Sequence, residues 1–530
     1  MNNKQIEIFD TTLRDGSQGE GISFSVHDKL AITEALDELG VSWIEAGNPG
    51  SNPKDADFFK QVKKLKLNNS RICAFGSTRK KGLTAKNDKQ LADLLSADTE
   101  TVVIFGKASA LHVTEVLQAS LDENLDMIFS SIEFLRSEGR EVFFDAEHFF
   151  DGLAQNCGYA LKSIKTAAEA GAARIILCDT NGGNFPLVVN AGTIEAADHI
   201  KTISGKTPSL GIHAHNDSGL AIACSIAAVE AGCTQVQGTL LGFGERCGNT
   251  CLAALIPGLE HKMKMRCLPA GHLSRLTEIS RRVAEIANCT LNDDIPYIGA
   301  HAFSHKAGMH ADAILKISSS FEHIEPSIVG NDRHFLMSEQ GGRAAIAERV
   351  REFDSEIDKF HPAIDALSRR LKALEAEGWA FDGADASFEI LVCKELGLYK
   401  SFFDLIAFRV QSEYPAGKLM ECCHAWVKVL VNGQYEMAAA EGDGPVNALD
   451  EALRRSLTGF YPRLKKMRLT DYKVRVIDGK AATAAKVRVL IESTDGVSSW
   501  TTVGVSADII AASSLALVDS IAYNLKRAAV

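Results

Sequence analysis

Eight short apolar runs, each ending in polar or glycine-containing turns, recur through the first half of the chain. They span residues 6–10, 43–47, 72–76, 102–106, 142–146, 175–179, 210–215 and 236–241. Segments with helical spacing of apolar residues lie between them. In residues 25–40, for example, Ile32, Ala35, Leu36 and Leu39 share one face, and Gly40 provides a stop. Strand and helix therefore alternate, which predicts parallel strands joined by crossover helices.

Eight such units within about 260 residues match the size of a (β/α)8 TIM barrel, whose catalytic side chains come from the carboxyl ends of the strands. A doubly wound sheet is the alternative α/β fold. It is less favoured because no glycine-rich phosphate-binding sequence follows the first run. We therefore predict an α/β protein whose residues 1–270 form a TIM-barrel catalytic domain.

The remaining residues divide into two further parts. Beyond residue 270 the strand pattern stops, and we expect helical linker subdomains over residues 271–380 that cover the active site of their own barrel or of a partner's. From residue 381 an internal repeat appears: the run 425–431 with the later Gly442 has a counterpart in 485–491 with Gly504, and a helical segment follows each. Residues 381–530 are predicted to form an α+β domain for regulation or dimerisation.

Bulk composition narrows the class of protein. The formal charge of −11 argues against a nucleic-acid partner. No signal peptide precedes the first run and no apolar run is expected to span a membrane, so we expect a cytoplasmic protein. The 12 cysteines lack paired zinc-ribbon spacing, which favours reduced thiols. Cys247 and Cys251 are expected to be packing residues.

Polar side chains follow the runs and are predicted to meet at one mouth of the barrel. Asp15 follows the first run, Glu147 the fifth, Thr180 the sixth and Asn249 the eighth, while the seventh contains His213 and His215. Histidines two residues apart on a strand share one face. Together Asp15, His213, His215 and Asn249 offer a mixed ligand set that suits Mn²⁺, Mg²⁺ or Zn²⁺ with positions left for substrate. Taken singly, the histidines could be half-buried polar residues, Asp15 a turn residue and Asn249 a helix N-cap.

Three motifs carry a family resemblance: residues 10–16 (DTTLRDG), 213–217 (HAHND) and 244–249 (GERCGN). They resemble the signatures of the DRE-TIM metallolyases, in the branch of 2-isopropylmalate, homocitrate and citramalate synthases. The resemblance extends through the connector, 303–312 (FSHKAGMHAD), to the C-terminal module. Within the branch, residues 50–55, 104–107 and 144–152 are most similar to the citramalate synthase group.

The resemblance implies a transferase that condenses acetyl-CoA with a 2-oxo acid chelated to a divalent metal, and then hydrolyses the thioester. Pyruvate is the implied acid, as a step of isoleucine biosynthesis. Arg14 is implied to polarise the keto group and bind substrate, and Thr180 to bind the substrate carboxylate. Arg14 could instead, or also, form a structural ion pair with Glu147, and Thr180 could cap its own loop.

The same resemblance assigns Glu147 and His310 jointly to deprotonation of acetyl-CoA and to thioester hydrolysis, with the division between them open. His301 and His305 compete with His310 as connector histidines. A homodimer is implied, because the connector of one subunit covers the barrel of another in this family.

Several positions depart from the family pattern. Phe321 replaces a usual tyrosine, Asn48 a tryptophan, and Ala108-Ser109-Ala110 a bulkier stretch. Residues 511–514 (AASS) lack an aromatic, which leaves feedback by isoleucine as a hypothesis. The alternatives are the same chemistry on 2-oxoisovalerate, 2-oxoglutarate or oxaloacetate, a metal-dependent lyase or aldolase, and an amino-acid sensor. A second substrate carboxylate would need added positive charge near Phe75, Ile104 or Phe105, where only Lys107 is evident.

Overall fold

The computed structural model describes residues 4–201, 207–306, 308–335, 343–351, 357, 360–413, 422–477 and 485–529. Its contacts divide the chain into two compact units. The first comprises Met1–Phe303 and His323–Arg333, and the second Ser304–Glu322 and His334–Val530. Residues 271–380 are therefore shared between the two units.

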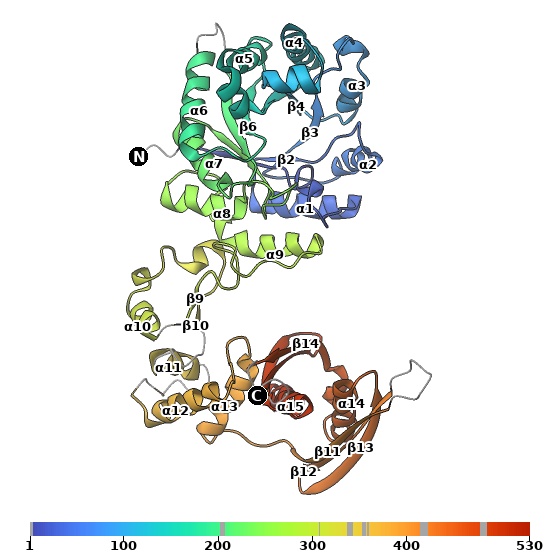
Figure 1. Cartoon of the computed structure of the whole chain (residues 1–530), viewed down its shortest axis with the longest axis vertical. Helices are drawn as coiled ribbons and strands as arrows, with labels where there is room; N and C mark the ends of the chain where they lie inside the picture. The colour runs from blue at the N-terminus through green and yellow to red at the C-terminus, as the bar shows by residue number, and fades with distance from the viewer. Residues whose placement is uncertain are drawn as a thin grey trace. The chain divides into compact units, whose positions relative to one another are not determined.

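The first unit is built on a closed barrel of parallel strands (Figure 1). The strands are β1 (Glu7–Asp10), β2 (Trp43–Glu45), β3 (Arg71–Ser77), β4 (Thr101–Lys107), β5 (Glu141–Glu147), β6 (Arg174–Asp179), β7 (Ser209–Ala214) and β8 (Gln235–Gly238). They follow one another in sequence order, and β1 closes the barrel by pairing with β8. The predicted TIM barrel is confirmed.

Helices alternate with these strands. They are α1 (Val26–Leu39), α2 (Pro53–Val62), α3 (Lys89–Ser96), α4 (Leu121–Ser137), α5 (Phe149–Glu169), α6 (Pro186–Ile200), α7 (Ala221–Glu230) and α8 (Leu252–Pro257). Helix α1 shows how residues at each end of a helix set where it begins and ends. Ser25 and Asp28 form a reciprocal capping box at the start of α1, and Gly40 ends it in the left-handed region with φ 92°.

Strand β8 is shorter than the predicted run 236–241. After Gly238 the chain leaves the barrel, because the amide of Thr239 donates to the carbonyl of Thr250 and the amide of Leu240 donates to the hydroxyl of Thr12. The apolar run continues past this turn because Leu240 is still fully buried. The predicted strand was too long because Leu240 is buried without being part of β8.

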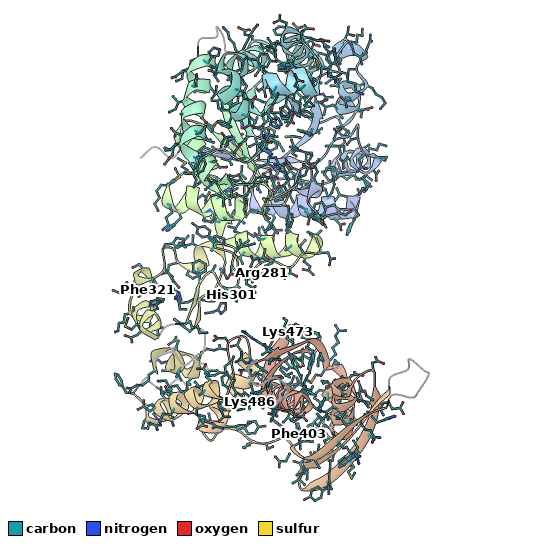
Figure 2. The ribbon with its side chains drawn as sticks, in the orientation of Figure 1. Arg281, His301, Phe321, Phe403, Lys473 and Lys486 are labelled. Carbon is teal, nitrogen blue, oxygen red and sulfur yellow. The ribbon has the colours of Figure 1, made fainter. Side chains whose placement is uncertain are left out.

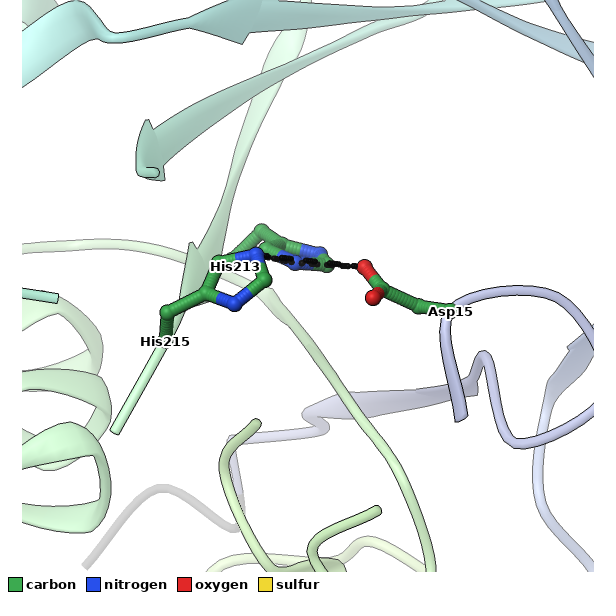
Figure 3. Close-up of side chains that lie close together, drawn as sticks. All are labelled: Asp15, His213 and His215. Atoms are coloured by element: carbon green, nitrogen blue, oxygen red, sulfur yellow. Dashed lines mark hydrogen bonds and ion pairs between the residues drawn. The ribbon is translucent and has the colours of Figure 1, made fainter. Parts of the chain in front are cut away.

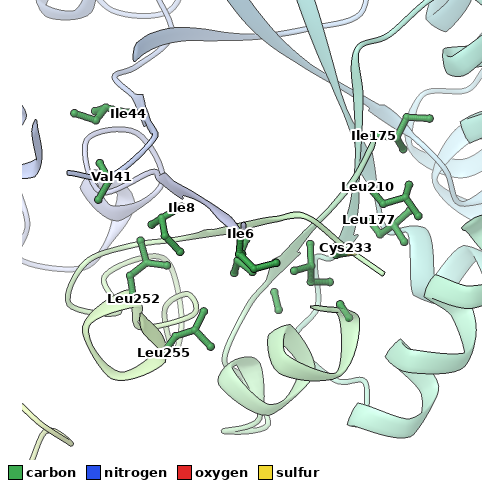
Figure 4. Packing of buried hydrophobic residues seen from close by; sticks show 14 of the residues in the cluster. Ile6, Ile8, Val41, Ile44, Ile175, Leu177, Leu210, Cys233, Leu252 and Leu255 are labelled. Carbon is green, nitrogen blue, oxygen red and sulfur yellow. The ribbon is translucent and has the colours of Figure 1, made fainter. Parts of the chain in front are cut away.

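Alternation along the strands separates two apolar layers. Side chains on one face pack between the strands and the surrounding helices, including Ile8, Ile44, Ile175 and Leu177, and Leu252 of α8 packs in the same cluster (Figure 4). Side chains on the other face form an interior layer inside the barrel, made of Phe9, Trp43, Cys73, Val103, Phe143, Ile176 and Cys178. Trp43 and Phe143 meet edge to face in this layer, with ring centroids 5.1 Å apart. The interior layer fills the barrel below its mouth.

Part of the connector packs on its own barrel. Helix α9 (Leu276–Ile286) contacts α1, where Arg282 donates to Glu38 at 2.6 Å. The hydroxyl of Thr277 donates to the carbonyl of Val329 at 2.7 Å, which ties the segment 323–333 to the same unit. The helices and strands in the rest of the connector belong to the second unit: β9 (Ser304–His305), α10 (Gly308–Lys316), β10 (His334–Phe335), α11 (Arg343–Arg351) and α12 (Pro362–Ala376). Helix α13 (Asp385–Glu395) follows the connector in the same unit.

The C-terminal part contains two successive repeats, each made of a three-stranded sheet followed by a helix. In the first, the antiparallel strands β11 (Asp404–Glu413), β12 (Cys422–Val431) and β13 (Gln434–Gly442) precede α14 (Pro445–Thr458). In the second, β14 (Arg468–Val476), β15 (Val487–Thr494) and β16 (Ser499–Ser506) precede α15 (Ile509–Ala529). The predicted repeated runs are the central strands of the two sheets.

In each repeat a glycine lies where the helix approaches its sheet, although the two glycines differ in strand register. Gly442 ends β13 where α14 begins, and a Cβ there would lie 2.5 Å from the amide nitrogen of Ala448. Gly504 on β16 faces α15, and a Cβ there would lie 2.0 Å from the carbonyl oxygen of Ala512. Both positions therefore need glycine so that the helix can approach its sheet closely.

One helix in the described part of the chain, Ile509–Arg527, is long and apolar enough by length and composition to cross a membrane. No membrane-spanning segment was predicted from the sequence. Within the fold, 56% of this stretch is buried, and it packs against β15 and β16. The apolar side chains of this helix therefore pack in the core against the second sheet.

Candidate active site

A cavity of about 230 Å³ opens at the carboxyl ends of the barrel strands. Its lining comes from loops and strand ends around most of the barrel: Arg14, Asp15, Gln18, Phe75, Phe105, Asp145, Glu147, Cys178, Thr180, His213, His215, Glu245 and Arg246. The barrel topology thus brings together residues that are far apart in the sequence. Of the predicted site residues in the first unit, only Asn249 is outside this lining.

Asp15, His213 and His215 form a buried group that could hold a metal ion (Figure 3). The Nε2 atom of His213 lies 3.3 Å from Asp15 Oδ2 and 3.4 Å from His215 Nε2, and His215 Nε2 lies 3.9 Å from the same carboxylate oxygen. Strand β7 positions His213 directly. His215 lies just beyond the strand, where a backbone bridge to Asn249 holds it. The alternative of half-buried histidines and a surface Asp15 does not hold, since all three residues are buried.

Asn249 lies beside this group and supplies a test of whether a cation fits. Its Nδ2 donates to the carbonyl of Phe243 at 3.0 Å, while its buried Oδ1 has no hydrogen-bond partner among the described residues. A buried amide oxygen left without a donor is costly unless something else binds it. Asn249 is not the N-cap of α8, because Cys251 occupies that position. One carboxylate, two imidazoles and one free amide oxygen suit a divalent cation.

Electrostatics favour the protonation states that a cation needs at Asp15 and His215, whereas the hydrogen bond to Asp15 raises the pKa of His213 despite its burial. Burial opposes ionisation of Asp15, but Arg14 and His213 hold its pKa well below the ordinary value. Burial and the charge of His213 lower the pKa of His215 to about 4. At neutral pH, Asp15 is therefore an anion and His215 a neutral imidazole with a lone pair to offer.

Arg14 is held between two carboxylates. Its Nη1 donates to Asp15 Oδ2 at 3.1 Å, and its Nε donates to Glu45 Oε2 at 2.5 Å. The guanidinium also lies over the ring of Phe75, 3.8 Å from its centroid. Glu45 was not predicted as a site residue, although an acid in the middle of the apolar run 43–47 was a usable signal; in the structure it is fully buried. The alternative ion pair between Arg14 and Glu147 does not form in the structure.

Glu147 pairs instead with Lys107, the residue at the end of the neighbouring strand β4. Thr180 lies beside it at the end of β6, and its hydroxyl accepts a hydrogen bond from the amide of His148 at 2.8 Å. The carbonyl of Thr180 accepts from Arg246 Nη2 at 2.8 Å. Thr180 therefore links the loops after β5, β6 and β8 rather than capping its own loop.

The connector histidines have different surroundings. His310 lies on α10 in the second unit, where its ring stacks on Phe321 with centroids 4.0 Å apart. His301 is exposed and contacts Asp294 at 3.2 Å, and His305 contacts Glu322 at 3.0 Å (Figure 2 labels His301 and Phe321). His301 and His305 therefore each contact a carboxylate, whereas His310 stacks on an aromatic ring.

Two cysteines in the loop after β8 were predicted to be packing residues, and the structure confirms this for one of them. Cys251 Sγ contacts the carbonyl of Leu240 at 3.5 Å and packs against the barrel core, as predicted. Cys247 is exposed, so the expectation that it is a packing residue was wrong. Glycines with positive φ at 244 and 248 flank it and turn this loop outward.

Family models match the chain in three consecutive segments. Residues 5–283 match the HMGL-like model, residues 297–378 the homocitrate synthase post-HMGL domain-like model, and residues 382–525 the LeuA allosteric (dimerisation) domain. The first match covers the whole barrel. The order of the three agrees with the order expected from the sequence.

Full-length relatives narrow the family further. An (R)-citramalate synthase from Geobacter sulfurreducens is 47% identical over 98% of this chain and 98% of its own length. One from Aquifex aeolicus is 46% identical over 99% and 98%. The chain belongs to the citramalate synthase family. A probable 2-isopropylmalate synthase from Methanopyrus kandleri is only 30% identical over 97% of both chains, so the citramalate synthase family is clearly the nearer of the two.

Membership of the citramalate synthase family confirms the resemblance seen in the three motifs. It also confirms an acyl-CoA-dependent transferase as the class of enzyme. The departures at Asn48, Ala108 and Phe321 therefore occur within a citramalate synthase scaffold. Asn48 caps the turn before α2, where its Oδ1 accepts from the amide of Gly50, which gives it a local structural role.

Proposed function

We propose that the chain condenses the methyl group of acetyl-CoA with the keto carbon of pyruvate and hydrolyses the resulting thioester, which gives citramalate and CoA. The observation that carries this proposal is the position of Arg14 beside Asp15, His213 and His215 at the barrel mouth. The names of the curated relatives support the choice of substrates.

The cavity walls support a small monocarboxylate. Phe75 and Phe105 stack with centroids 5.5 Å apart and line one side. Lys107, the one cation near them that the sequence made evident, is paired with Glu147 and so is already neutralised. A second substrate carboxylate would find no free counter-charge on this wall, which disfavours 2-oxoglutarate and oxaloacetate.

The residues divide the chemistry as follows. A divalent metal, Mn²⁺, Mg²⁺ or Zn²⁺, held by Asp15, His213, His215 and Asn249 supplies Lewis-acid polarisation of the keto group. Arg14, fixed by Glu45, stabilises the negative charge that develops on the keto oxygen. Thr180 binds the pyruvate carboxylate through its hydroxyl.

Proton transfer is assigned to Glu147 and His310. One of them removes a proton from the methyl group of acetyl-CoA, and the carbon then bonds to the keto carbon, whose oxygen becomes a hydroxyl. Water then attacks the thioester carbonyl, CoA leaves as a thiol, and the acid is released. Phe321 supplies no hydroxyl for either step, so the ring supports His310 by stacking alone.

We also propose a homodimer formed through residues 381–530, with the linker region 271–380 of one subunit serving the barrel 1–270 of the other. The match of residues 382–525 to an allosteric (dimerisation) domain supports this arrangement. An amino-acid effector, with isoleucine as the first candidate, binds this domain in the proposal. Unchanged activity and melting temperature in saturating isoleucine and leucine would remove the effector from it.

The deciding experiment measures CoA thiol released from acetyl-CoA with Mn²⁺ or Mg²⁺ across pyruvate, 2-oxobutyrate, 2-oxoisovalerate, 2-oxoglutarate and oxaloacetate. We expect pyruvate to give the highest kcat/KM, with citramalate identified by mass spectrometry. His213→Ala should abolish turnover. A different leading acid would change the substrate and keep the mechanism, whereas no turnover with any acid in the presence of bound metal would refute the synthase.

A further inference from the structure

Gln237 on β8 lies directly behind one of the proposed metal ligands. It is fully buried and occupies the position in β8 that is paired with His213 in β7. The Oε1 atom of Gln237 and the Nδ1 atom of His213 are 2.8 Å apart. Gln237 is absent from the cavity lining, so it reaches the proposed metal group through His213.

The orientation of this contact determines which nitrogen of His213 is free. An amide oxygen can only accept, so Nδ1 must carry the proton and donate it to Gln237. The Nε2 atom then carries the lone pair, and this is the atom that faces Asp15 and His215 at 3.3 Å and 3.4 Å. The opposite tautomer would place a proton on Nε2, where a cation could not bind.

A carboxylate borders the other side of the amide. Asp145, a residue of the cavity lining, interacts with both His213 and Gln237. The Nε2 atom of Gln237 has no hydrogen-bond partner among the described residues, whereas its Oε1 atom has His213 Nδ1. The contact with His213 is therefore the one that orients the amide.

We propose that Gln237 is a positioning residue of the metal site, which holds the His213 ring and its Nδ1–H tautomer so that Nε2 is ready to bind a divalent cation. Partners of this kind behind a metal-binding histidine fix the ring orientation and raise its basicity. The proposal rests on the metal site of the proposed function but not on the identity of the 2-oxo acid.

Gln235 provides a matched control. It lies two residues earlier on β8, on the same face of the strand, and is also fully buried. Neither polar atom of its side chain has a hydrogen-bond partner among the described residues. Replacing either glutamine by leucine removes a buried amide from the same strand, but only Gln237 contacts a proposed ligand.

The test is an electron paramagnetic resonance titration of Mn²⁺ into full-length protein stripped with EDTA, which needs no turnover. We expect Gln237→Leu to weaken Mn²⁺ binding by about 10–100-fold. Gln235→Leu should leave the affinity within about twofold of wild type. Gln237→Glu, which keeps an acceptor for Nδ1–H, should bind at least as tightly as wild type.

Melting temperatures in EDTA establish that each variant folds. If Gln237→Leu does not fold, Gln237→Asn serves in its place, because the shorter side chain withdraws the oxygen from His213 while remaining polar. Wild-type affinity in Gln237→Leu or in Gln237→Asn would overturn the proposal. An equal loss in Gln235→Leu would also overturn it by showing a general packing effect. Failure of wild-type protein to bind Mn²⁺ would overturn the site itself, whereas tight binding without citramalate synthesis would overturn only the proposed reaction.

Discussion

Lys107 forms an ion pair with Glu147, and the two residues end the adjacent strands β4 and β5. Both side chains are largely shielded from solvent, with 14% and 23% exposed. The pair fixes the carboxylate that we assign to proton transfer at the rim of the cavity. A base needs a defined position relative to the proton that it abstracts.

We therefore expect Lys107→Met to lower kcat by about 10–100-fold, because a displacement of a catalytic group by about 1 Å costs this much. Lys107→Arg, which retains the charge, should lose less. Lys89→Met is the matched control, since Lys89 pairs with Asp93 on an exposed part of α3 and should keep wild-type kcat. Steady-state kinetics with pyruvate and acetyl-CoA checks all three; an undiminished kcat in Lys107→Met would show that the pair has no catalytic role.

Glu45 is the buried anchor of Arg14. Glu45→Gln removes the charge while keeping the shape, so Arg14 loses a charge-assisted hydrogen bond and so does the hydroxyl of Thr11, which donates to the same oxygen at 2.8 Å. We expect the barrel to lose about 1.5–3 kcal/mol of stability, the usual range for hydrogen bonds to charged groups. Urea unfolding followed by barrel tryptophan fluorescence provides the measurement.

Glu38→Gln is the control for this change. Glu38 pairs with Arg282 near the surface, where both side chains are about a third exposed, and such pairs contribute about 0–1 kcal/mol. Equal losses in the two variants would contradict the anchoring role of Glu45. A further decrease in kcat limited to Glu45→Gln would connect the anchor to Arg14 and the reaction.

Acid stability should depend on Glu7 at the amino-terminal end of β1. Burial raises its pKa, but the hydrogen bonds from Arg174 and Trp43 and the charge of Arg71 bring the net pKa below the ordinary value of 4.5. The unfolded chain therefore binds the proton at higher pH than the folded chain. The stabilisation is complete at neutral pH and is lost as the pH falls below about 4.5.

We expect Glu7→Gln to be less stable than wild type at pH 7 and the difference to shrink as the pH falls through the acid range. Melting temperatures of both proteins from pH 7 to pH 3 measure this convergence. Glu34→Gln, at an exposed position of α1, should follow wild type throughout. Parallel curves for Glu7→Gln and wild type would show that the ion pair makes no pH-dependent contribution.

The proposed exchange of linkers between subunits predicts complementation. Heterodimers of Glu147→Gln and His310→Ala subunits, purified with two different tags, contain one barrel with an intact Glu147 that receives an intact His310 from its partner. We expect about half of the wild-type activity per dimer, although both parent homodimers are inactive. If His310 served the barrel of its own chain, every site in the heterodimer would lack one residue. Inactive heterodimers would therefore refute the exchange.

The period of the apolar runs was sufficient to predict the barrel, because each run had to be a strand buried on both sides. The strand ends then placed Asp15, His213, His215 and Thr180 at one mouth without further information. Glu45 and Gln237 escaped because each lies inside an apolar run, and their importance depends on a partner more than 20 residues away in sequence. The Lys107–Glu147 pair escaped for a related reason: neighbouring strands bring the residues together, and their register cannot be read from composition.

The interior layer of Phe9, Trp43, Phe143 and their neighbours fills the inside of the barrel. Side chains therefore fill the barrel interior below the cavity, and the cavity lies at the mouth. Carbon–carbon bond formation benefits from excluding water, yet thioester hydrolysis consumes one water molecule, and that water must enter by the same route as the substrates. Access at the mouth is therefore common to both steps, so a substitution among the residues around the mouth is expected to affect condensation and hydrolysis together.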